Sequence, residues 1–388
     1  MNFNDPQDWT FPVPILYGPG RLKEISRFCI EAGMRNPLIV TDGGSAQLPF
    51  IGALQSYLAE GGLTTAVFSG ISPNPQDLEV SIGKEKFHQG SHDGVIAIGG
   101  GSGMDGGKAI ALVANNEIDL WKFEYDQVPP EITASTAFPP LITIPTTAGT
   151  GAETESTAMI TDTKKLMKWC VWHPQLKPAF AVLDPELTIG LPKNLTAWTG
   201  TDALVHAIEA YCVPGFNPLC DAMALEGMRL IFNWLPVTHE DPNNLGARGA
   251  MLSGSCLAGV AFLKGLGLVH AISHMIGAEY DTQHGLTNAI ILPAALRFNE
   301  PEISEKIKPM ANTAGLADTN FDAFYNHVCL LLDQLQIPVT LVDIGVPEDC
   351  SARIAQKAIK DSAAATNPRK LDIQAIELVL KDAIVHGR

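Results

Sequence analysis

The chain has 388 residues, of which 46% are hydrophobic and 18% are charged. This length exceeds what one compact core usually organises and predicts two domains. The formal net charge of −16 argues against a nucleic-acid partner, which requires a basic surface, and against binding to an anionic membrane surface.

The N-terminus and the cysteines suggest a cellular compartment. Residues 1–10 contain neither a basic segment nor an apolar core, so we expect no secretory signal peptide. The longest apolar run that we identify, Ala289 to Leu296, is too short to span a bilayer and contains Pro293. The seven cysteines are scattered and form no CxxC pair, which favours neither a disulfide framework nor a thiolate zinc site. We therefore expect buried thiols in a cytoplasmic protein.

Residues 1–190 alternate short apolar strands with helical segments. After a turn at 18–20, the patterns predict a helix over 21–32, a strand at 37–41 and a helix near 47–60. A strand at 64–68, a helix over 77–89 and strands at 94–98 and 141–144 follow. This order predicts an α/β dinucleotide-binding domain with a Rossmann-like parallel sheet, whose ligands bind at the carboxyl ends of the strands.

Residues 191–388 carry long helical patterns and almost no strand-like runs. The expected helices are 195–211, 218–235, 245–262, 268–279, 287–298, 303–314, 321–335, 352–360 and 373–384. We therefore predict that an all-helical second domain, with the metal-binding and catalytic residues, follows the α/β domain.

A glycine-rich segment lies directly between the strand at 94–98 and the next helix. It consists of Gly99, Gly100, Gly101, Ser102 and Gly103. Glycines let backbone N–H groups approach a pyrophosphate, and the following helix directs its positive end at the phosphates. Because the segment lacks the full GxGxxG spacing, a plain tight turn is the alternative interpretation.

Two other strand ends carry polar residues suited to a nucleotide. Asp42 can accept hydrogen bonds from a ribose diol and would repel a 2′-phosphate, which favours NAD over NADP. The alternative for Asp42 is a solvated turn residue. Segment 145–153, which includes Thr146, Thr147 and Thr150, supplies small residues and hydroxyls for a cofactor groove, although a generic loop has the same composition.

Five metal-competent side chains lie between residues 202 and 284. Asp202 and His206 are four residues apart, as are His270 and His274, so each pair projects from one helix face, while His284 follows in a glycine-flanked turn. One carboxylate with three imidazoles suits Fe²⁺ or Zn²⁺. Buried core histidines and an N-cap role for Asp202 are the alternatives. Spacing alone does not decide between His270 and His274, and the group left over would serve as a proton shuttle or orient the substrate.

Together these segments resemble the iron-dependent, group III alcohol dehydrogenases, which share a dehydroquinate synthase-like architecture with glycerol dehydrogenase. The resemblance extends from about residue 42 to residue 369. Its motifs are Gly99-Gly-Gly-Ser102 with Asp105 and Lys108, Pro145-Thr-Thr-Ala-Gly-Thr-Gly151, Gly200-Thr-Asp-Ala-Leu-Val-His206-Ala-Ile-Glu-Ala-Tyr211, Gly267-Leu-Val-His270 with His274, His284-Gly-Leu-Thr-Asn-Ala289 and Asn367-Pro-Arg369.

The resemblance assigns roles to individual residues. It implies metal ligands at Asp202, His206, His270 and His284, with His274 as the neighbouring catalytic histidine. It implies that the cofactor contacts Gly99 to Gly103, Thr146, Thr147 and Thr150, with Asn74 near the adenosine and Lys168 on the ribose. Asp42 takes the position that the family uses to disfavour NADP. The sequence departs from the family at Gly103, where proline is usual, at Gly106 or Gly107, where alanine is usual, and at Trp198, where a small residue is usual.

The implied reaction is hydride transfer between a primary alcohol or aldehyde and NAD, with the substrate oxygen on Fe²⁺, Zn²⁺ or another divalent metal. A homodimer or larger homo-oligomer is the implied assembly. The alternatives are an oxo-acid reductase, a transhydrogenase or a lyase of the same superfamily, and a non-catalytic protein that binds metal and nucleotide. The intact ligand set argues against metal-free reductases, and the lack of an Arg/Lys cluster near the site argues against the lyase.

Overall fold

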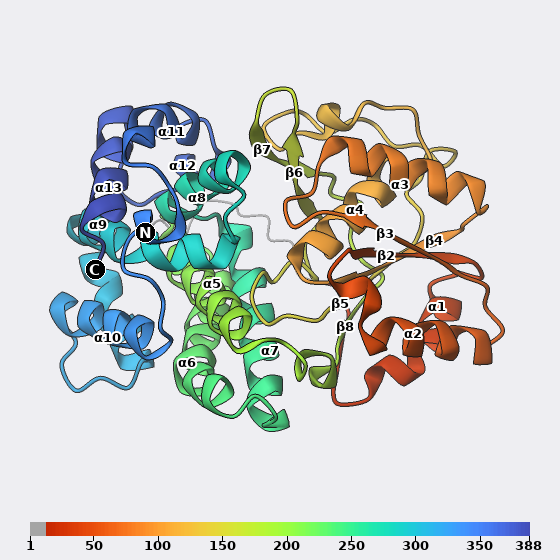
Figure 1. Cartoon of the computed structure of the whole chain (residues 1–388), viewed down its shortest axis with the longest axis horizontal. Coiled ribbons are helices and arrows are strands. Elements are labelled where there is room, and N and C mark those ends of the chain that lie inside the picture. The colour runs from red at the N-terminus through yellow and green to blue at the C-terminus, as the bar shows by residue number, and fades with distance from the viewer. Residues whose placement is uncertain (1–12) are drawn as a thin grey trace. The chain divides into compact units, whose positions relative to one another are not determined.

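The computed structural model describes residues 13–388, so the expectation about a signal peptide falls outside the described residues (Figure 1). Backbone proximity divides the chain into two compact units. The α/β unit comprises residues 13–147 and 152–190, and the helical unit comprises residues 148–151 and 191–388. The short segment 148–151 thus belongs to the helical unit although its flanking residues belong to the other.

The α/β unit is organised around a six-stranded sheet in the order β1-β8-β5-β4-β2-β3, in which all neighbouring strands are parallel. The strands are β1 (Ile15–Tyr17), β2 (Pro37–Asp42), β3 (Ala66–Ile71), β4 (Gly94–Gly99), β5 (Leu141–Pro145) and β8 (Phe180–Leu183). This confirms the expected Rossmann-like parallel sheet.

Successive side chains of a strand point to opposite faces of the sheet, and together they form an apolar core on each face. Val95 and Ala97 of β4 join the core that includes residues of α3 (Asp77–Gln89) and α4 (Gly101–Ala114), whereas Ile96 and Ile98 join the core formed with α1 (Ile25–Glu31) and α2 (Pro49–Glu60). Figure 1 shows these two helix pairs on opposite faces. Because both faces are covered, β4 is apolar throughout, and each fully buried aliphatic side chain contributes about 1.5–3 kcal/mol.

Strands β1 and β8 and a separate hairpin in the α/β unit were not predicted. β1 is only three residues long and lies at one edge of the sheet. β6 (Thr157–Asp162) and β7 (Met167–Trp172) form a separate antiparallel hairpin.

Short 3₁₀ helices occur in both units. They are Arg21–Glu24, Ser45–Gln47, Leu120–Phe123, Pro185–Thr188, Phe262–Lys264, Val342–Ile344 and Glu348–Cys350.

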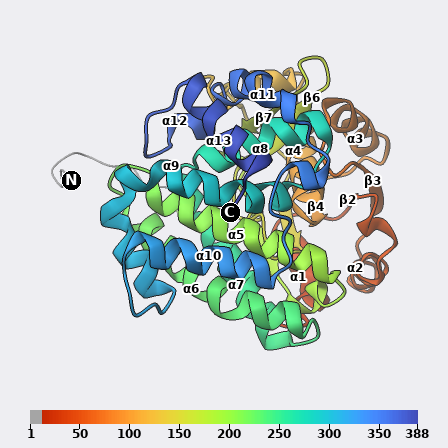
Figure 2. The ribbon, with the colours of Figure 1, turned by 60° about the vertical axis from the view of Figure 1, so that its left-hand side comes forward.

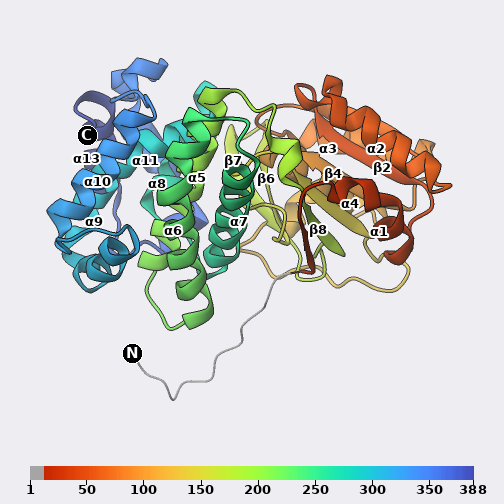
Figure 3. The same cartoon turned by 90° about the horizontal axis from the view of Figure 1, so that it is seen from below.

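The helical unit confirms the expectation of an all-α second part. Its helices are α5 (Lys193–Cys212), α6 (Pro218–Glu240), α7 (Leu245–Ala261), α8 (Leu268–Tyr280), α9 (His284–Thr313), α10 (Phe321–Gln334), α11 (Ser351–Ala358), α12 (Ser362–Ala365) and α13 (Ile373–Val385). Helices α5, α6 and α7 lie side by side (Figure 3). Gly227 allows the close approach of α6 to α7, because a Cβ there would lie 3.0 Å from the carbonyl oxygen of Gly254.

Helix α9 corrects two expectations. The sequence predicted helices at 287–298 and 303–314, but one continuous 30-residue helix spans both and contains Pro293, Pro301 and Pro309 (Figure 2). Its N-cap is Gln283, whose side chain accepts a hydrogen bond from the N–H of Leu286 at 2.6 Å. His284 is consequently the first residue of a helix and not part of a turn.

One segment of the described chain, Leu245–Lys264, is long and apolar enough to cross a membrane by length and composition. The expectation drawn from Ala289 to Leu296 overlooked it. Because 67% of its most apolar window is buried inside the structure, its apolar surface is already used in packing, as in the core helix of a globular protein.

Candidate metal and cofactor sites

Helix α5 places Asp202 and His206 on one buried face, one helical turn apart. Both lie well inside the helix, with side chains that are at most 4% exposed, so Asp202 is not an N-cap and that alternative is wrong. Helix α8 contributes the buried His270, and the first turn of α9 contributes His284, which is partly exposed. Three helices therefore bring the candidate ligands together.

The four candidate ligands each offer one donor atom to a common point. These atoms, from Asp202, His206, His270 and His284, all lie within 4.8 Å of one another. The Oδ1 atom of Asp202 is 3.9 Å from Nε2 of His270 and 3.7 Å from Nε2 of His284. One carboxylate oxygen with imidazole nitrogens in so small a volume is a donor set that fits Fe²⁺ or Zn²⁺.

The Nδ1 atom of each histidine is held by a neighbouring group. Nδ1 of His206 is 3.3 Å from the carbonyl oxygen of Gly149, and Nδ1 of His284 is 3.5 Å from Oγ of Ser273. Nδ1 of His270 is 2.6 Å from Oε2 of Glu209. Such partners orient the rings and leave the Nε2 lone pairs available for a cation.

Burial and nearby charges shift the pKa values of His206 and His270 in opposite directions. Burial lowers the pKa of His206 to about 4, so this imidazole is neutral at physiological pH. Burial also disfavours protonation of His270, but the hydrogen bond and charge of Glu209, together with the charge of Asp202, outweigh it and raise the pKa of His270. A cation must therefore compete with a proton for His270.

Asn288, one turn after His284, supports a cation at this point. Its Nδ2 atom lies 2.7 Å from Oδ1 of Asp202, 3.2 Å from Nε2 of His270 and 3.1 Å from Nε2 of His284. Its fully buried Oδ1 atom has no hydrogen-bond partner among the described residues. Three acceptors thus converge on a single amide group, and a divalent cation would satisfy the same lone pairs with more positive charge. The residues present therefore fit a metal.

His274 lies beside this cluster and has its own acidic partner. Its ring stacks on that of His284 with centroids 5.4 Å apart, and its Nδ1 atom is 2.9 Å from Oδ2 of Asp361. An ionised carboxylate only accepts hydrogen bonds, so Nδ1 of His274 carries the proton and Nε2 offers a lone pair. The structure thus separates His270, within the cluster, from His274, beside it.

At the carboxyl end of the parallel sheet, two glycines let the backbone pack closely against neighbouring residues. Gly99 has φ of +142°, and a Cβ there would lie 2.9 Å from Oδ2 of Asp42. A Cβ at Gly103 would lie 2.9 Å from the carbonyl oxygen of Ile98. The Asp42 carboxylate is itself oriented by Ser45, whose N–H and hydroxyl both donate to it. We call Gly99 to Gly103 the glycine cradle; its backbone packs closely against Asp42 and Ile98 because Gly99 and Gly103 carry no side chains.

Helix α4 begins inside this cradle, at Gly101, and has no side-chain cap. Its N-cap is Gly100, which makes no side-chain hydrogen bond, and the first turn of α4 holds no acidic residue. Within residues 13–388, the buried hydroxyls of Thr41 and Thr147 find no hydrogen-bond partners. N–H groups at a helix start and unsatisfied hydroxyls near a glycine cradle are the groups that a phosphate would engage, so the residues present fit a dinucleotide.

The remaining cofactor candidates are distributed over two places. Lys168 of β7 donates to Oδ1 of Asn74 at 3.5 Å, so the hairpin and the loop before α3 bring these two residues together. Thr146 and Thr147 follow β5 in the α/β unit, whereas Thr150 belongs to the segment assigned to the helical unit.

The α/β unit also buries a lysine and a glutamate. Nζ of Lys108 donates to the carbonyl oxygen of Ala152 at 2.9 Å and lies 3.1 Å from Oδ1 of Asp105. Glu155 is buried and accepts a long hydrogen bond, 3.4 Å, from the Thr154 hydroxyl. Burial raises the pKa of Glu155 to about 8 although the charge of Lys108 opposes the shift.

Sequence reasoning missed several residues around the cluster. Glu209 follows His206 by three positions, and Asn288 follows His284 by four, so the spacing rule that paired Asp202 with His206 also places them beside the ligands. Asp361 gives no such local signal, because it reaches His274 across 87 positions of sequence.

Comparison with protein-family models matches both parts of the chain. The model described as iron-containing alcohol dehydrogenase matches residues 12–185, and the model described as Fe-containing alcohol dehydrogenase family, C-terminal, matches residues 196–384.

Individual relatives match almost the whole chain. It is 35% identical to the 1,3-propanediol dehydrogenase of Citrobacter freundii, over 97% of this chain and 98% of that protein. It is also 35% identical to the NAD-dependent methanol dehydrogenase of Bacillus methanolicus, over 96% and 98% of the two chains. A solved structure of 1,3-propanediol oxidoreductase superposes with a TM-score of 0.91 at 34% identity, covering 97% of this chain and 99% of that one. With both family models and these full-length relatives in agreement, the chain belongs to the iron-containing alcohol dehydrogenase family.

Proposed function

We propose that this chain is a metal-dependent, NAD(H)-linked alcohol dehydrogenase that interconverts a primary alcohol and its aldehyde. The observation that carries the proposal is the close approach of four donor atoms, one each from Asp202, His206, His270 and His284. The Nδ1 atom of each imidazole lies within 3.5 Å of a neighbouring oxygen. Family membership supports the same reaction class.

Those four side chains would hold a divalent cation, with Fe²⁺ the first candidate and Zn²⁺ or another divalent metal the alternatives. When bound, such a cation supplies Lewis-acid stabilisation of negative charge on the substrate oxygen. His274 is proposed as the catalytic histidine: Asp361 fixes its proton on Nδ1, so that Nε2 can take the hydroxyl proton of an alcohol. In aldehyde reduction the same nitrogen returns a proton to the product.

NAD is the proposed hydride carrier, because the methanol dehydrogenase relative is described as NAD-dependent and the α/β unit has a fitting glycine cradle. Gly99, Gly100, Gly101, Ser102 and Gly103 are proposed to bind its pyrophosphate at the start of α4. Asp42 is proposed to accept from the ribose diol and to disfavour NADP. Thr146, Thr147, Thr150, Asn74 and Lys168 complete the proposed cofactor-binding set.

A cytoplasmic location and a homo-oligomeric assembly are also proposed. Within the described chain no two of the seven cysteines form a disulfide bond, as expected in the reducing cytoplasm. A homodimer or larger homo-oligomer is proposed on the family resemblance, and light scattering of the purified protein tests it. Besides the metal and NAD, the proposed partner is a small alcohol or aldehyde.

The deciding experiment strips the protein of metal, reloads it anaerobically with Fe²⁺ or Zn²⁺, and follows NADH oxidation with a panel of short aldehydes. Turnover that is lost on stripping and restored by one metal is the expected result. Turnover unchanged by stripping would contradict the metal-dependent mechanism. Tight NADH binding without turnover of any aldehyde would instead favour an oxo-acid substrate, testable with 2-oxo acids in the same assay, or a non-catalytic binder.

A further inference from the structure

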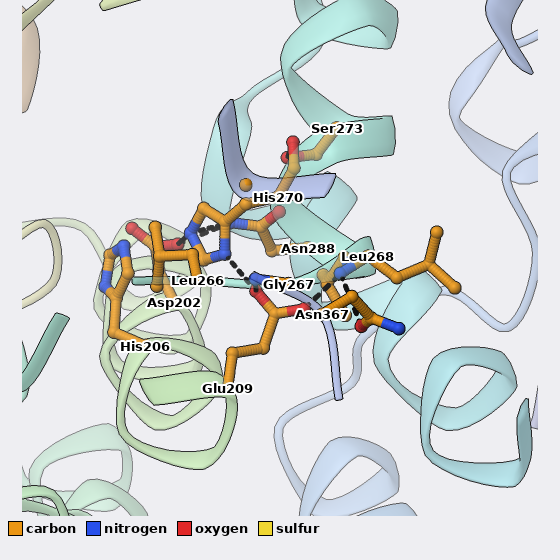
Figure 4. Close-up of polar contacts among 12 residues, drawn as sticks. Asp202, His206, Glu209, Leu266, Gly267, Leu268, His270, Ser273, Asn288 and Asn367 are labelled. Atoms are coloured by element: carbon orange, nitrogen blue, oxygen red, sulfur yellow. Dashed lines mark hydrogen bonds and ion pairs between the residues drawn. The ribbon is translucent and has the colours of Figure 1, made fainter. Parts of the chain in front are cut away.

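A buried glutamate lies behind the metal cluster, at the start of the helix that carries His270. Glu209 is on α5, one turn after His206, and is 6% exposed. Its two oxygens accept three N–H groups: Oε1 accepts from Val269 N at 2.7 Å, and Oε2 is bonded to Gly267 N at 3.1 Å and to Nδ1 of His270 at 2.6 Å. Figure 4 shows the carboxylate between the imidazole and the backbone at 267–268.

Helix α8 has no cap of its own. Its N-cap is Gly267, which makes no side-chain hydrogen bond, and the first N–H groups of a helix need partners from outside. Glu209 satisfies those of Gly267 and Val269, and Oδ1 of Asn367 accepts from Leu268 N at 3.1 Å. A Cβ at position 267 would lie 2.8 Å from Oε1 of Glu209, so glycine is required for this approach.

The same carboxylate determines which nitrogen of His270 is free. A carboxylate has no proton to donate, so Nδ1 of His270 must carry the hydrogen and Nε2 keeps its lone pair toward Asp202 and Asn288. One residue therefore fixes both the backbone position of α8 and the tautomer of the ligand on it. The two functions share Oε2, which accepts from Gly267 and from His270.

We propose that Glu209 is a positioning residue for the metal site, which anchors the start of α8 and holds His270 in the tautomer that binds a cation. The inference rests on the proposed function, since it assumes that the cluster binds a divalent metal. Partners of this kind typically change metal affinity by about 10- to 100-fold when they are removed.

Glu209→Gln is the discriminating substitution because it is nearly isosteric. An amide has one acceptor oxygen and one NH₂ group, whereas three N–H groups face the two oxygens of Glu209. If the NH₂ group faces His270, the imidazole must accept at Nδ1 and carry its proton on Nε2, which blocks a metal bond. If it faces Val269, two donors oppose each other at the start of α8.

Asn367→Ala is the matched control, since it removes a bond to the same helix start but none to His270. The Asn367 amide caps Leu268 and pairs with Asn299. A purely structural role for Glu209 predicts that both variants behave alike. A role in metal positioning predicts that only the glutamate variant weakens the metal.

The experiment measures Zn²⁺ affinity by competition with a chromogenic chelator, the visible spectrum at saturating Co²⁺, and the Tm of the metal-free full chain. We expect Glu209→Gln to weaken Zn²⁺ binding about 10- to 100-fold and to shift the Co²⁺ bands. Asn367→Ala should lower the metal-free Tm but change Zn²⁺ affinity by less than about threefold, with the Co²⁺ bands unmoved.

Wild-type Zn²⁺ affinity in Glu209→Gln, or equal weakening in both variants, would overturn the proposal. If Glu209→Gln does not fold, Glu209→Asp decides: it keeps an acceptor-only carboxylate but shortens its reach, so we expect weaker Zn²⁺ binding, and wild-type affinity would overturn the proposal. Failure of the wild-type chain itself to bind Zn²⁺ or Co²⁺ would count against the proposed function, and is thus distinguishable.

Discussion

The two candidate sites differ in composition, because one is formed by side chains and the other by backbone. In the helical unit, the cluster around Asp202 consists of buried side chains, and each ring or carboxylate is held by a further group. In the α/β unit, the cradle at Gly99 and Gly103 consists of backbone that carries no side chains. The first site depends on the side chains that are present, and the second on their absence.

The two units also differ in the hydrogen bonds that each provides to a buried glutamate. Glu209 is buried in the helical unit with three N–H donors. Glu155 is buried in the α/β unit with one long hydrogen bond from Thr154 and a lysine nearby. Few hydrogen-bond donors reach the buried carboxylate of Glu155, and its burial favours the protonated form.

The largest expected effect comes from replacing one carboxylate oxygen of Asp202, which should impair the metal site and leave the cofactor site unchanged. Asp202→Asn should reduce metal content and lower kcat/KM about a thousandfold, because several kcal/mol of charge stabilisation at the substrate oxygen is lost. NADH binding, measured by fluorescence, should stay near wild type because the cradle is untouched. The control is Asp221→Asn on α6, which breaks an ion pair with Lys264 but should leave kcat/KM within about threefold of wild type. Full activity of Asp202→Asn would refute the metal assignment.

The raised pKa of Glu155 predicts a pH effect on stability. The pKa of Glu155, near 4.5 in an unfolded chain, is raised to about 8 by burial, so between these values the folded protein holds a proton that the unfolded chain has released. Stability from this group is therefore present below about pH 4.5 and falls as pH rises toward 8. Glu155→Gln should remove that fall and be more stable than wild type by on the order of a few kcal/mol at pH 8.5 but not at pH 4.5. Urea unfolding at both pH values checks this, and a pH-independent difference would contradict it.

The backbone character of the cradle is tested by adding one methyl group. In Gly103→Ala the new Cβ would lie 2.9 Å from the Ile98 carbonyl oxygen and 3.3 Å from the Asp42 nitrogen, neither of which is on a flexible side chain. We expect a loss of about 1–3 kcal/mol in stability and weaker NADH binding. The control is Gly52→Ala in α2, where a Cβ meets nothing within 4 Å and should stabilise the chain by about 0.5–1 kcal/mol. Similar outcomes for both glycines would refute the cradle.

The smallest expected effect concerns cofactor choice. Asp42→Ala should raise the ratio of NADPH to NADH activity about tenfold, because repulsion of a 2′-phosphate by a nearby carboxylate amounts to about 1 kcal/mol or somewhat more near a protein surface. Ser45→Ala keeps the charge but removes the hydroxyl that donates to Asp42, so its ratio should stay close to wild type. An unchanged ratio in Asp42→Ala would move the origin of the preference elsewhere.

Much of the fold followed from periodicity, because buried strands and amphipathic helices repeat their pattern along the chain. The exceptions have physical reasons. β1 was missed because three residues are too few to display a period. The gap between the predicted helices 287–298 and 303–314 contains Pro301, which lacks an N–H and ordinarily disrupts a helix. Helix α9 is nevertheless continuous, with buried Asn299 and Ile303 on either side of this proline.

The candidate site divides in the same way. Asp202 and His206 share one helix, so their four-residue spacing alone predicts that they lie together. The choice between His270 and His274 needed long-range partners, because Glu209 and Asp361 come from elements far along the chain. Local spacing can propose ligands, but only tertiary contacts assign the proton on each ring.

The first N–H groups of α8 are capped by residues outside the helix, and this has a consequence for the order in which the protein is made. Its first N–H groups depend on Glu209, which precedes them by about 60 positions, and on Asn367, which follows by 99. Contacts over such separations form late, because the intervening chain must first be closed into loops. A ribosome that has already synthesised all four candidate ligands has therefore not yet synthesised every residue that caps the helix carrying His270.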